Sequence, residues 1–244
     1  MTQVVQSAAL KILVTGGSGL LGTALKKFLP AADFPLRQDF GVTNLAQMEQ
    51  YVAGQNFTTL LHLAAFTAVP QCEVMPLLPL QTNILGTANV VQVCQKFNLK
   101  LFYLSTDYVF SGEEGNYAEN DPVLPVNKYA WSKLGGECAV RMLDNSVILR
   151  ASFGPTVFPY AKAFTDQWTS RESVTVLARK IARLLKTDFR GVLHLGGPRQ
   201  TVWEYAQNLQ PRQAIGKITR KEVNFPAPKD TSLKTTRYQN LNLE

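Results

Sequence analysis

A glycine-rich turn near the start of this 244-residue sequence restricts its possible folds more than any other feature. Apolar residues and Thr15 precede the turn, and an amphipathic stretch follows it. Glycine lets a backbone approach a pyrophosphate closely, and the first N–H groups of a helix have no partner within that helix. This order is typical of a dinucleotide-binding βα unit. We therefore expect the following residues to contact the cofactor: Gly16, Ser18, Gly19, Leu20, Leu21 and Gly22.

The rest of the chain continues this alternation of short apolar runs and amphipathic stretches. The pattern predicts strands at residues 11–15, 59–63, 100–105, 146–150 and 191–195, and helices at 19–29, 45–53, 81–97, 128–143, 176–185 and 201–209. The strands are continuously apolar, as expected when helices cover both faces of a parallel sheet. We therefore predict an α/β fold with a Rossmann-type doubly wound parallel sheet. Residues 1–150 are expected to form the NAD(P)-binding domain, and residues 151–244 a small C-terminal substrate lobe interleaved with it.

Charge and cysteine content narrow the classes of partner. The formal net charge of +7 favours anionic ligands, but the basic residues are scattered, so we expect a nucleotide-type ligand and no nucleic acid. Cys72, Cys94 and Cys138 are widely spaced in apolar surroundings, which predicts packing residues in a reducing compartment and neither a disulfide nor a metal site. Residues 1–10 lack a signal-peptide pattern and no segment has the length of a membrane span, so we expect a cytoplasmic protein.

The segment at residues 34–38 bears on which dinucleotide is bound. It is expected to form the second strand, and it ends on Arg37. An acid at this place accepts a ribose hydroxyl of NAD, whereas a guanidinium pairs with the extra phosphate of NADP. Arg37 therefore predicts NADP(H). Asp33 and Asp39 flank the segment, so a different strand register would favour NAD(H) instead.

Three side chains form a candidate catalytic group. Tyr129 and Lys133 are four residues apart and hence on one face of the predicted helix. A nearby cation favours the ionised form of a phenol, so Lys133 is expected to lower the pKa of Tyr129. Thr106 stands at the end of a buried strand upstream, where a hydroxyl can polarise a substrate carbonyl as hydride arrives. Together these residues predict proton transfer coupled to hydride transfer.

The sequence around these residues also resembles a known family. Residues 105–110 read Ser-Thr-Asp-Tyr-Val-Phe, and Tyr129, Ser132, Lys133 and Glu137 follow. With this string the chain is similar to the extended short-chain dehydrogenase/reductases, most closely to the dTDP-4-dehydrorhamnose reductase family. The resemblance covers nearly the whole chain. It implies transfer of hydride from NADPH to the 4-keto carbon of a nucleotide-linked deoxysugar.

The resemblance also implies roles for individual residues. Thr106 would polarise the ketone, Tyr129 would donate the proton, and Lys133 would tune Tyr129 and bind the nicotinamide ribose. Further implied cofactor contacts are Ala64, Ala65 and Asn83, in addition to Tyr129 and Lys133. Implied substrate contacts are Thr67, Val69, Thr106, Asp107, Tyr129 and Phe153.

Several positions depart from the family pattern. Gly41 stands where the family has an acid that contacts the adenine, Pro70 replaces another acid, and Phe153 replaces a tryptophan that contacts the substrate. A further helix and strand of the family are missing between Phe164 and Asp166. This deletion shortens the substrate lobe and predicts a more open pocket. The cofactor site is expected to be affected less than the substrate site.

Two other functions remain open at this point. The same scaffold serves epimerases and dehydratases of nucleotide sugars, which retain their nicotinamide through the cycle. It also resembles a non-catalytic NADP-binding regulatory subunit, that of methionine adenosyltransferase. A homodimer is compatible with each of these functions.

Overall fold

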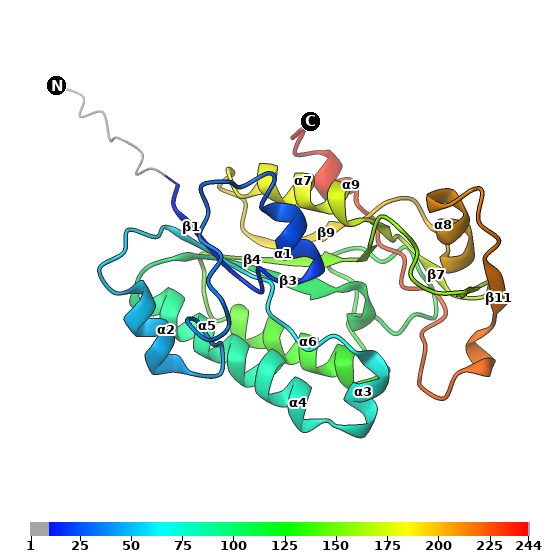
Figure 1. Cartoon of the computed structure of the whole chain (residues 1–244), viewed down its shortest axis with the longest axis horizontal. Coiled ribbons are helices and arrows are strands. Elements are labelled where there is room, and N and C mark those ends of the chain that lie inside the picture. Colours follow the sequence, from blue (N-terminus) through cyan, green and yellow to red (C-terminus); the bar gives the residue numbers. More distant parts are fainter. Residues whose placement is uncertain (1–9, 244) are drawn as a thin grey trace.

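The computed structural model describes residues 10–243 and has a parallel five-stranded sheet at its centre (Figure 1). The strand order is β1-β2-β3-β4-β9, and every neighbouring pair is parallel. The strands are β1 (Ile12–Thr15), β2 (Thr59–His62), β3 (Lys100–Thr106), β4 (Ser146–Ala151) and β9 (Gly191–Leu195). The predicted doubly wound α/β fold is confirmed. Residues 1–9, which belong to the N-terminal segment without a signal-peptide pattern, lie outside the described residues.

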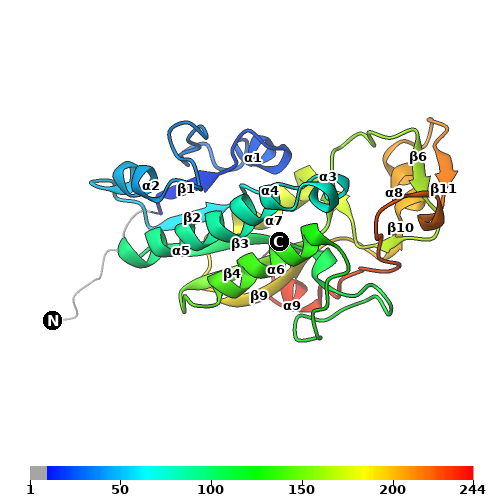
Figure 2. The ribbon, with the colours of Figure 1, turned by 90° about the horizontal axis from the view of Figure 1, so that it is seen from below.

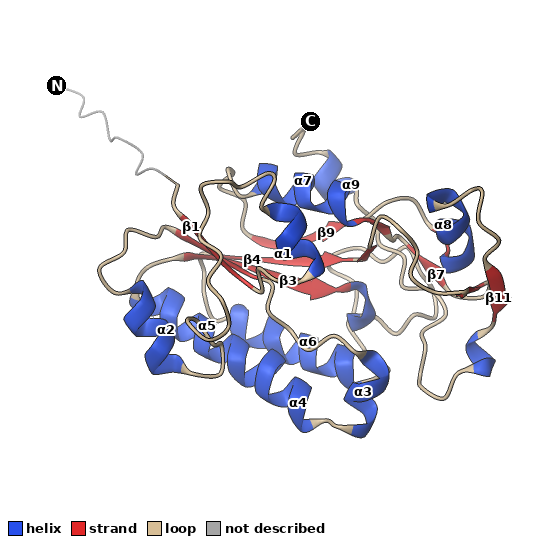
Figure 3. Ribbon diagram, viewed as in Figure 1, coloured by secondary structure: helices blue, strands red, loops and turns tan. Residues whose placement is uncertain are grey.

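Helices cover both faces of this sheet (Figure 3). One face carries α1 (Leu20–Leu25), α7 (Val174–Leu184) and α9 (Thr236–Gln239), and the other carries α2 (Leu45–Val52), α5 (Gly86–Lys96) and α6 (Lys128–Val140). Alternate residues of each strand enter the two cores: Val14 packs on the α1 side and Leu13 on the α2 side. This double burial explains why the strands are continuously apolar.

The predicted strand at residues 34–38 is wrong. Only Asp33 pairs with the sheet, through a bridge to Leu13 in which its N–H donates to the Ile12 carbonyl at 2.9 Å. Pro35 lacks the N–H that a longer ladder would need. The chain thus passes one side of β1 at Asp33 and then returns to β2 on the other side. The glycine turn after β1 therefore lies at the point where the direction of winding reverses, the usual ligand position in such sheets.

Several helix boundaries also differ from the prediction. The helix expected at residues 81–97 begins as a π-helical segment, η1 (Leu80–Leu85), and becomes α-helical only in α5. Helices α1 and α6 end at Leu25 and Val140, earlier than expected, because the following turns are closed by tighter bonds such as Phe28 N–H to the Leu25 carbonyl. Two short helices, α3 (Val69–Val74) and α4 (Leu77–Pro79), precede η1.

Short strands and one helix form a separate cluster at one end of the sheet (Figure 2). Strands β6 (Lys162–Phe164) and β11 (Gly216–Ile218) pair, as do β7 (Trp168–Thr169) and β10 (Gln200–Thr201). With α8 (Val202–Leu209) they enclose their own apolar core, made of Phe158, Ala163, Val202, Tyr205, Ala206 and Ile215. Two more short strands, β5 (Phe153–Gly154) and β8 (Glu172–Ser173), pair with each other. In the sequence β5 directly follows β4, and β8 directly precedes α7. In the sequence, α7 and β9 stand between β8 and β10, and both belong to the central layers.

The lengths of the helices, the grouping of metal-binding side chains and the positions of the cysteines bear on partners and chemistry. Within residues 10–243, no helix combines the length and apolar character needed to cross a membrane. Over the same residues, no group of three or more His, Cys, Asp or Glu side chains could hold a metal ion. Cys72 and Cys94 are buried, but Cys138 is exposed, so the predicted packing role is wrong for Cys138. Its helix turns that side chain away from the sheet.

Candidate active site

Two neighbouring cavities meet at the glycine turn. The larger, of about 470 Å³, extends from the turn past the end of β3 to the cluster around α8. The smaller, of about 250 Å³, extends from the turn to Arg37. Gly16, Gly19, Leu63 and Ala65 line both cavities. A ligand long enough to occupy both would therefore cross the carboxyl end of the sheet at the turn.

The glycines make the close packing of the turn possible. Gly16 has a positive φ of 72°, and a Cβ atom at Gly22 would lie only 2.4 Å from the Gly16 carbonyl oxygen. Gly19 donates its N–H to that oxygen at 3.0 Å and is exposed toward the cavities. Leu20, Leu21 and Gly22 line the larger cavity, and Ser18 lines the smaller. The turn is thus a tight cradle with open space above Gly19, which fits a bound pyrophosphate.

Arg37 lies where the phosphate of NADP would be expected. It is exposed and lines the smaller cavity together with Pro35, Thr43 and Thr82. Asp33, the acid that could accept a ribose hydroxyl, instead accepts a hydrogen bond from the Tyr51 hydroxyl at 2.9 Å and lines neither cavity. Since the neighbouring acid is already engaged, the arrangement favours an additional phosphate over a bare ribose. Arg37 lines this cavity although the strand expected at residues 34–38 is absent.

The three predicted catalytic residues line the larger cavity together. Thr106 is the last residue of β3, and Tyr129 and Lys133 lie one turn apart on α6. Asn127 caps this helix by accepting the Ala130 N–H at 2.9 Å, which fixes the start of α6 directly before Tyr129. Four further predicted substrate contacts also line the cavity: Thr67, Val69, Asp107 and Phe153.

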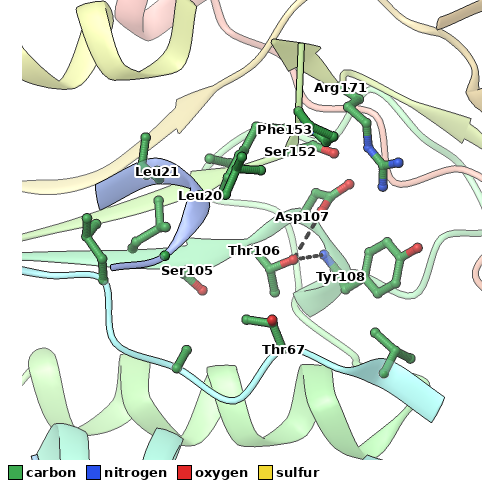
Figure 4. Close-up of a pocket in the computed structure, with 18 of the residues that line it drawn as sticks. Leu20, Leu21, Thr67, Ser105, Thr106, Asp107, Tyr108, Ser152, Phe153 and Arg171 are labelled. Atoms are coloured by element: carbon green, nitrogen blue, oxygen red, sulfur yellow. Dashed lines mark hydrogen bonds between the residues drawn. The ribbon is translucent and has the colours of Figure 1, made fainter. Parts of the chain in front are cut away.

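Backbone and side-chain hydrogen bonds hold Thr106 in place (Figure 4). Its hydroxyl accepts the Tyr108 N–H at 3.2 Å and donates to Asp107 Oδ1 at 3.1 Å. The other oxygen of Asp107 accepts a hydrogen bond from Thr231 at 2.6 Å. Burial raises the pKa of Asp107, while these hydroxyls and Arg171 oppose the rise. The carboxyl group thus anchors Thr106 to the C-terminal part of the chain.

Tyr129 is held in its protonated form. Burial raises its pKa above the usual value for a phenol, and a hydrogen bond with Thr106 acts in the opposite direction. The sequence predicts that Lys133 lowers this pKa, but the net shift is upward, because removal of the phenolate from water has the larger effect. A neutral phenol beside the Thr106 hydroxyl is a proton donor.

Lys133 is itself almost fully buried. Its Nζ atom lies over the ring of Tyr103, 4.2 Å from the centroid, and burial lowers its pKa to about 7 while Glu137 opposes the change. An ammonium group that is this close to neutrality responds strongly to any anion placed beside it. A cofactor phosphate placed beside it would therefore favour the charged form of Lys133.

Two predicted cofactor residues, Ala64 and Asn83, differ in their positions. Ala64 lines the smaller cavity next to Ala65. Asn83 is fully buried in the π-helical segment and lines neither cavity. Its amide bonds the Phe66 backbone at 2.7 and 2.9 Å and donates to the Ser132 hydroxyl at 2.8 Å. Asn83 thus ties the loop after β2 to α6, the helix that carries Tyr129.

A buried ion pair beneath the site was not anticipated from the sequence. Arg150 on β4 bonds both carboxylate oxygens of Glu137 on α6, at 3.0 and 2.9 Å, and Ser105 donates to the same carboxylate at 2.5 Å. Ser105 immediately precedes Thr106, and Glu137 lies one turn beyond Lys133. The pair therefore links β4 to β3 and α6, the two elements that carry the predicted catalytic residues.

The far wall of the larger cavity was also missed. It includes residues from the region of the small cluster: Ser152, Phe158, Tyr160, Arg171 and Tyr205. These positions have no regular spacing in the sequence, so no periodic signal could have grouped them. Tyr108 also lines this wall and directly follows the predicted Asp107. Only adjacency to a predicted site residue could have indicated it.

Comparison with known proteins agrees with this geometry. The model of the RmlD substrate binding domain matches residues 10–242. The chain belongs to this family. The dTDP-4-keto-6-deoxy-D-glucose reductase of Streptomyces niveus is 29% identical over 213 residues, which cover 78% of this chain and 74% of that protein. The predicted resemblance to the dTDP-4-dehydrorhamnose reductases is thereby confirmed.

Two further proteins are similar to this chain. The Bacillus anthracis dTDP-4-dehydrorhamnose reductase, solved in complex with NADP, superposes with a TM-score of 0.85 at 25% identity and covers 97% of this chain and 92% of its own. The methionine adenosyltransferase 2 subunit beta of Rattus norvegicus is 27% identical over 235 residues, covering 80% of this chain and 70% of that protein. The predicted enzyme class, an NADP-dependent oxidoreductase of the extended short-chain type, is supported by the reductases.

Proposed function

We propose that this protein reduces the 4-keto group of a nucleotide-linked deoxysugar with NADPH. The observation that carries the proposal is that Thr106, Tyr129 and Lys133 lie on one wall of a cavity that also includes the glycine turn. Proton donor and cofactor loop therefore border the same space. The Streptomyces niveus and Bacillus anthracis reductases named above support the choice of substrate and cofactor.

The proton-transfer part of the reaction follows from the side chains. When bound, the reduced nicotinamide supplies a hydride to the carbonyl carbon. The Thr106 hydroxyl and the Tyr129 phenol are placed to hydrogen-bond the carbonyl oxygen and to stabilise the negative charge that develops on it. Tyr129 then gives its proton to that oxygen, which completes a hydroxyl group. Its raised pKa keeps this proton available at neutral pH.

The remaining predicted site residues bind and orient the two ligands in this proposal. The glycine turn and Arg37 hold the phosphates of NADP(H), and Lys133 holds the nicotinamide ribose. Thr67, Val69, Asp107 and Phe153 contact the sugar. Asn83 acts indirectly, by positioning the Phe66 loop and α6. Within residues 151–244, the cluster around α8 serves as the substrate lobe. The five-stranded sheet binds the cofactor.

The test is a spectrophotometric assay with a dTDP-linked 4-keto-6-deoxysugar. We expect loss of NADPH absorbance with the unaltered protein and a fall in kcat of about 10²- to 10⁴-fold for Tyr129→Phe, because the proton donor is lost. The NADPH dissociation constant should change far less than kcat. Tyr238→Phe is the matched control, since Tyr238 lies on α9 and lines neither cavity. Equal rates for Tyr129→Phe and the unaltered protein would refute the proposed role.

The relationship to methionine adenosyltransferase 2 subunit beta favours one alternative, a regulatory NADP-binding subunit. In that case the purified protein would bind NADPH without consuming it in the presence of any keto-sugar. An epimerase or dehydratase would convert the sugar without net consumption of NADPH. One assay that follows both cofactor and sugar separates all three functions.

Partners and location form a further part of the proposal. We place the protein in the cytoplasm, acting on a small nucleotide sugar without nucleic acid. Exposed apolar side chains on α4, η1 and α6, namely Leu77, Leu85 and Trp131, are proposed to contact a second copy of the chain. Light scattering after size exclusion should then give twice the mass of 27.1 kDa, and Trp131→Glu should lower it to one chain.

A further inference from the structure

Arg171 lies on the wall of the larger cavity opposite the glycine turn. It stands between β7 and β8, where its N–H donates to the Thr169 hydroxyl at 3.1 Å. Its side chain passes the ring of Tyr205, with the guanidinium carbon 6.0 Å from the ring centroid. Figure 4 shows the guanidinium directed toward the part of the cavity that Asp107 and Tyr108 line.

Within the described part of the chain, the guanidinium of Arg171 lacks the carboxylate partner that four other arginines have. Arg150, Arg199, Arg220 and Arg237 each pair with a carboxylate, whereas no ion pair among residues 10–243 includes Arg171. Its Nε atom is buried and has no hydrogen-bond partner within those residues. The adjacent Glu172 pairs with Lys180 at 2.6 Å instead. A buried donor without an acceptor is costly, so a ligand that supplies the acceptor is favoured.

The charges around the cavity indicate the sign of that ligand. Of the residues from 10 to 243 that line the cavity, one is acidic, Asp107, and two are basic, Lys133 and Arg171. Both oxygens of Asp107 already accept hydrogen bonds, from Thr106 and from Thr231. The guanidinium of Arg171 therefore remains a positive charge without an ion-pair partner among the described residues, in a cavity that is partly shielded from water. Such a site favours an anion with two oxygens that match the guanidinium.

We propose that Arg171 binds the diphosphate group that links sugar and nucleoside in the substrate. This inference rests on the proposed function, because the sugar ring fixes the geometry. The 4-keto carbon must lie at Thr106 and Tyr129, and the anomeric carbon lies on the opposite side of a six-membered ring. The diphosphate therefore points away from the catalytic residues. Arg171, on the lobe side of the cavity, is the cation placed to receive it.

The test measures ligand binding to the NADP-loaded protein by calorimetry, with dTDP and thymidine as probes. We expect Arg171→Gln to raise the dTDP dissociation constant about 10- to 100-fold, the range for a charged hydrogen-bonded pair. Arg171→Lys should recover part of the loss, because it retains the charge without the fork. Thymidine and NADPH should bind as before. Arg212→Gln is the matched control, since this exposed arginine lines neither cavity.

The outcomes separate this inference from the proposed function. Unchanged dTDP binding by Arg171→Gln, parallel loss of thymidine binding, or no dTDP binding by the unaltered protein would each overturn the role of Arg171. If Arg171→Gln weakens dTDP binding while the unaltered protein reduces no keto-sugar, the inference stands and the proposed reduction fails. If reduction occurs and Arg171→Gln leaves the substrate KM unchanged, the reduction stands and the inference fails.

Discussion

Replacing Arg150 by methionine removes the cation from the buried ion pair beneath the active site. The Arg150 and Glu137 side chains are 2% and 0% exposed, and two hydrogen bonds join them. In Arg150→Met the Glu137 carboxylate keeps only the Ser105 hydroxyl as a partner. An unpaired buried charge of this kind costs about 3–5 kcal/mol of folding free energy. That is a large part of the roughly 5–15 kcal/mol by which domains are stable.

Removing both charges should be much less harmful than the two single losses predict. In Glu137→Leu/Arg150→Met neither charge of the pair remains, and two other groups each lose a hydrogen-bond partner: the Glu119 carbonyl, which accepts from Arg150 at 3.2 Å, and the Ser105 hydroxyl, which donates to Glu137. We expect a loss of about 1–3 kcal/mol for the double variant from these groups. The single variants together would predict roughly 6–10 kcal/mol. The coupling energy between the two positions should therefore exceed about 3 kcal/mol.

Urea unfolding followed by circular dichroism gives the four free energies of this cycle. The exposed pair of Lys96 and Glu49 serves as a control, because its N–O distance is 2.7 Å but its side chains are 54% and 30% exposed. Breaking it should change stability by less than about 1 kcal/mol. If the losses at Glu137 and Arg150 simply add, or if the exposed pair couples as strongly, burial does not govern this interaction and the reasoning is refuted.

Three further outcomes are expected. Gly22→Ala should weaken NADPH binding and lower thermal stability, since its Cβ would lie 2.4 Å from a backbone oxygen; unchanged melting and affinity would contradict the tight cradle. Arg37→Gln should reduce the preference for NADPH over NADH in measured dissociation constants, and an unchanged ratio would exclude its phosphate contact. Burial lowers the pKa of both His62 and His194 to about 3, so each should stay neutral by NMR between pH 8 and 5. Below pH 6.5 the unfolded chain gains protons that the folded chain does not, and each histidine should reduce stability by ~1.4 kcal/mol at pH 5.5.

Much of the active site could be predicted because its residues follow local patterns. Thr106 ends a buried strand, and Tyr129 and Lys133 share one helix face, so strand edges and helical spacing suffice to bring them together. The same holds for Gly16 and Gly22, which are close in the sequence and act on their own turn. These groups depend on backbone geometry over a few residues. Such geometry is determined by the local sequence itself.

The protonation of Tyr129 could not be predicted in this way. Its proximity to Lys133 was correct as a matter of spacing, but the pKa depends on how much water the surrounding chain removes. Likewise, Arg37 lines the smaller cavity although its predicted strand does not form, and Asp33 is the residue that pairs with β1 and bonds Tyr51. Desolvation and competition for partners involve every neighbouring element at once.

The sequence by itself determined the sheet, the glycine cradle and the shared cavity position of Thr106, Tyr129 and Lys133, since each follows from periodicity or from contacts between near neighbours. Only the tertiary structure decided the far wall of the cavity, where Arg171 arrives from a segment without regular spacing and remains unpaired. It also decided the pairing of Glu137 with Arg150, which lie on different elements. A charge acquires its role from the partners that folding brings near it, and those partners are distant in the chain.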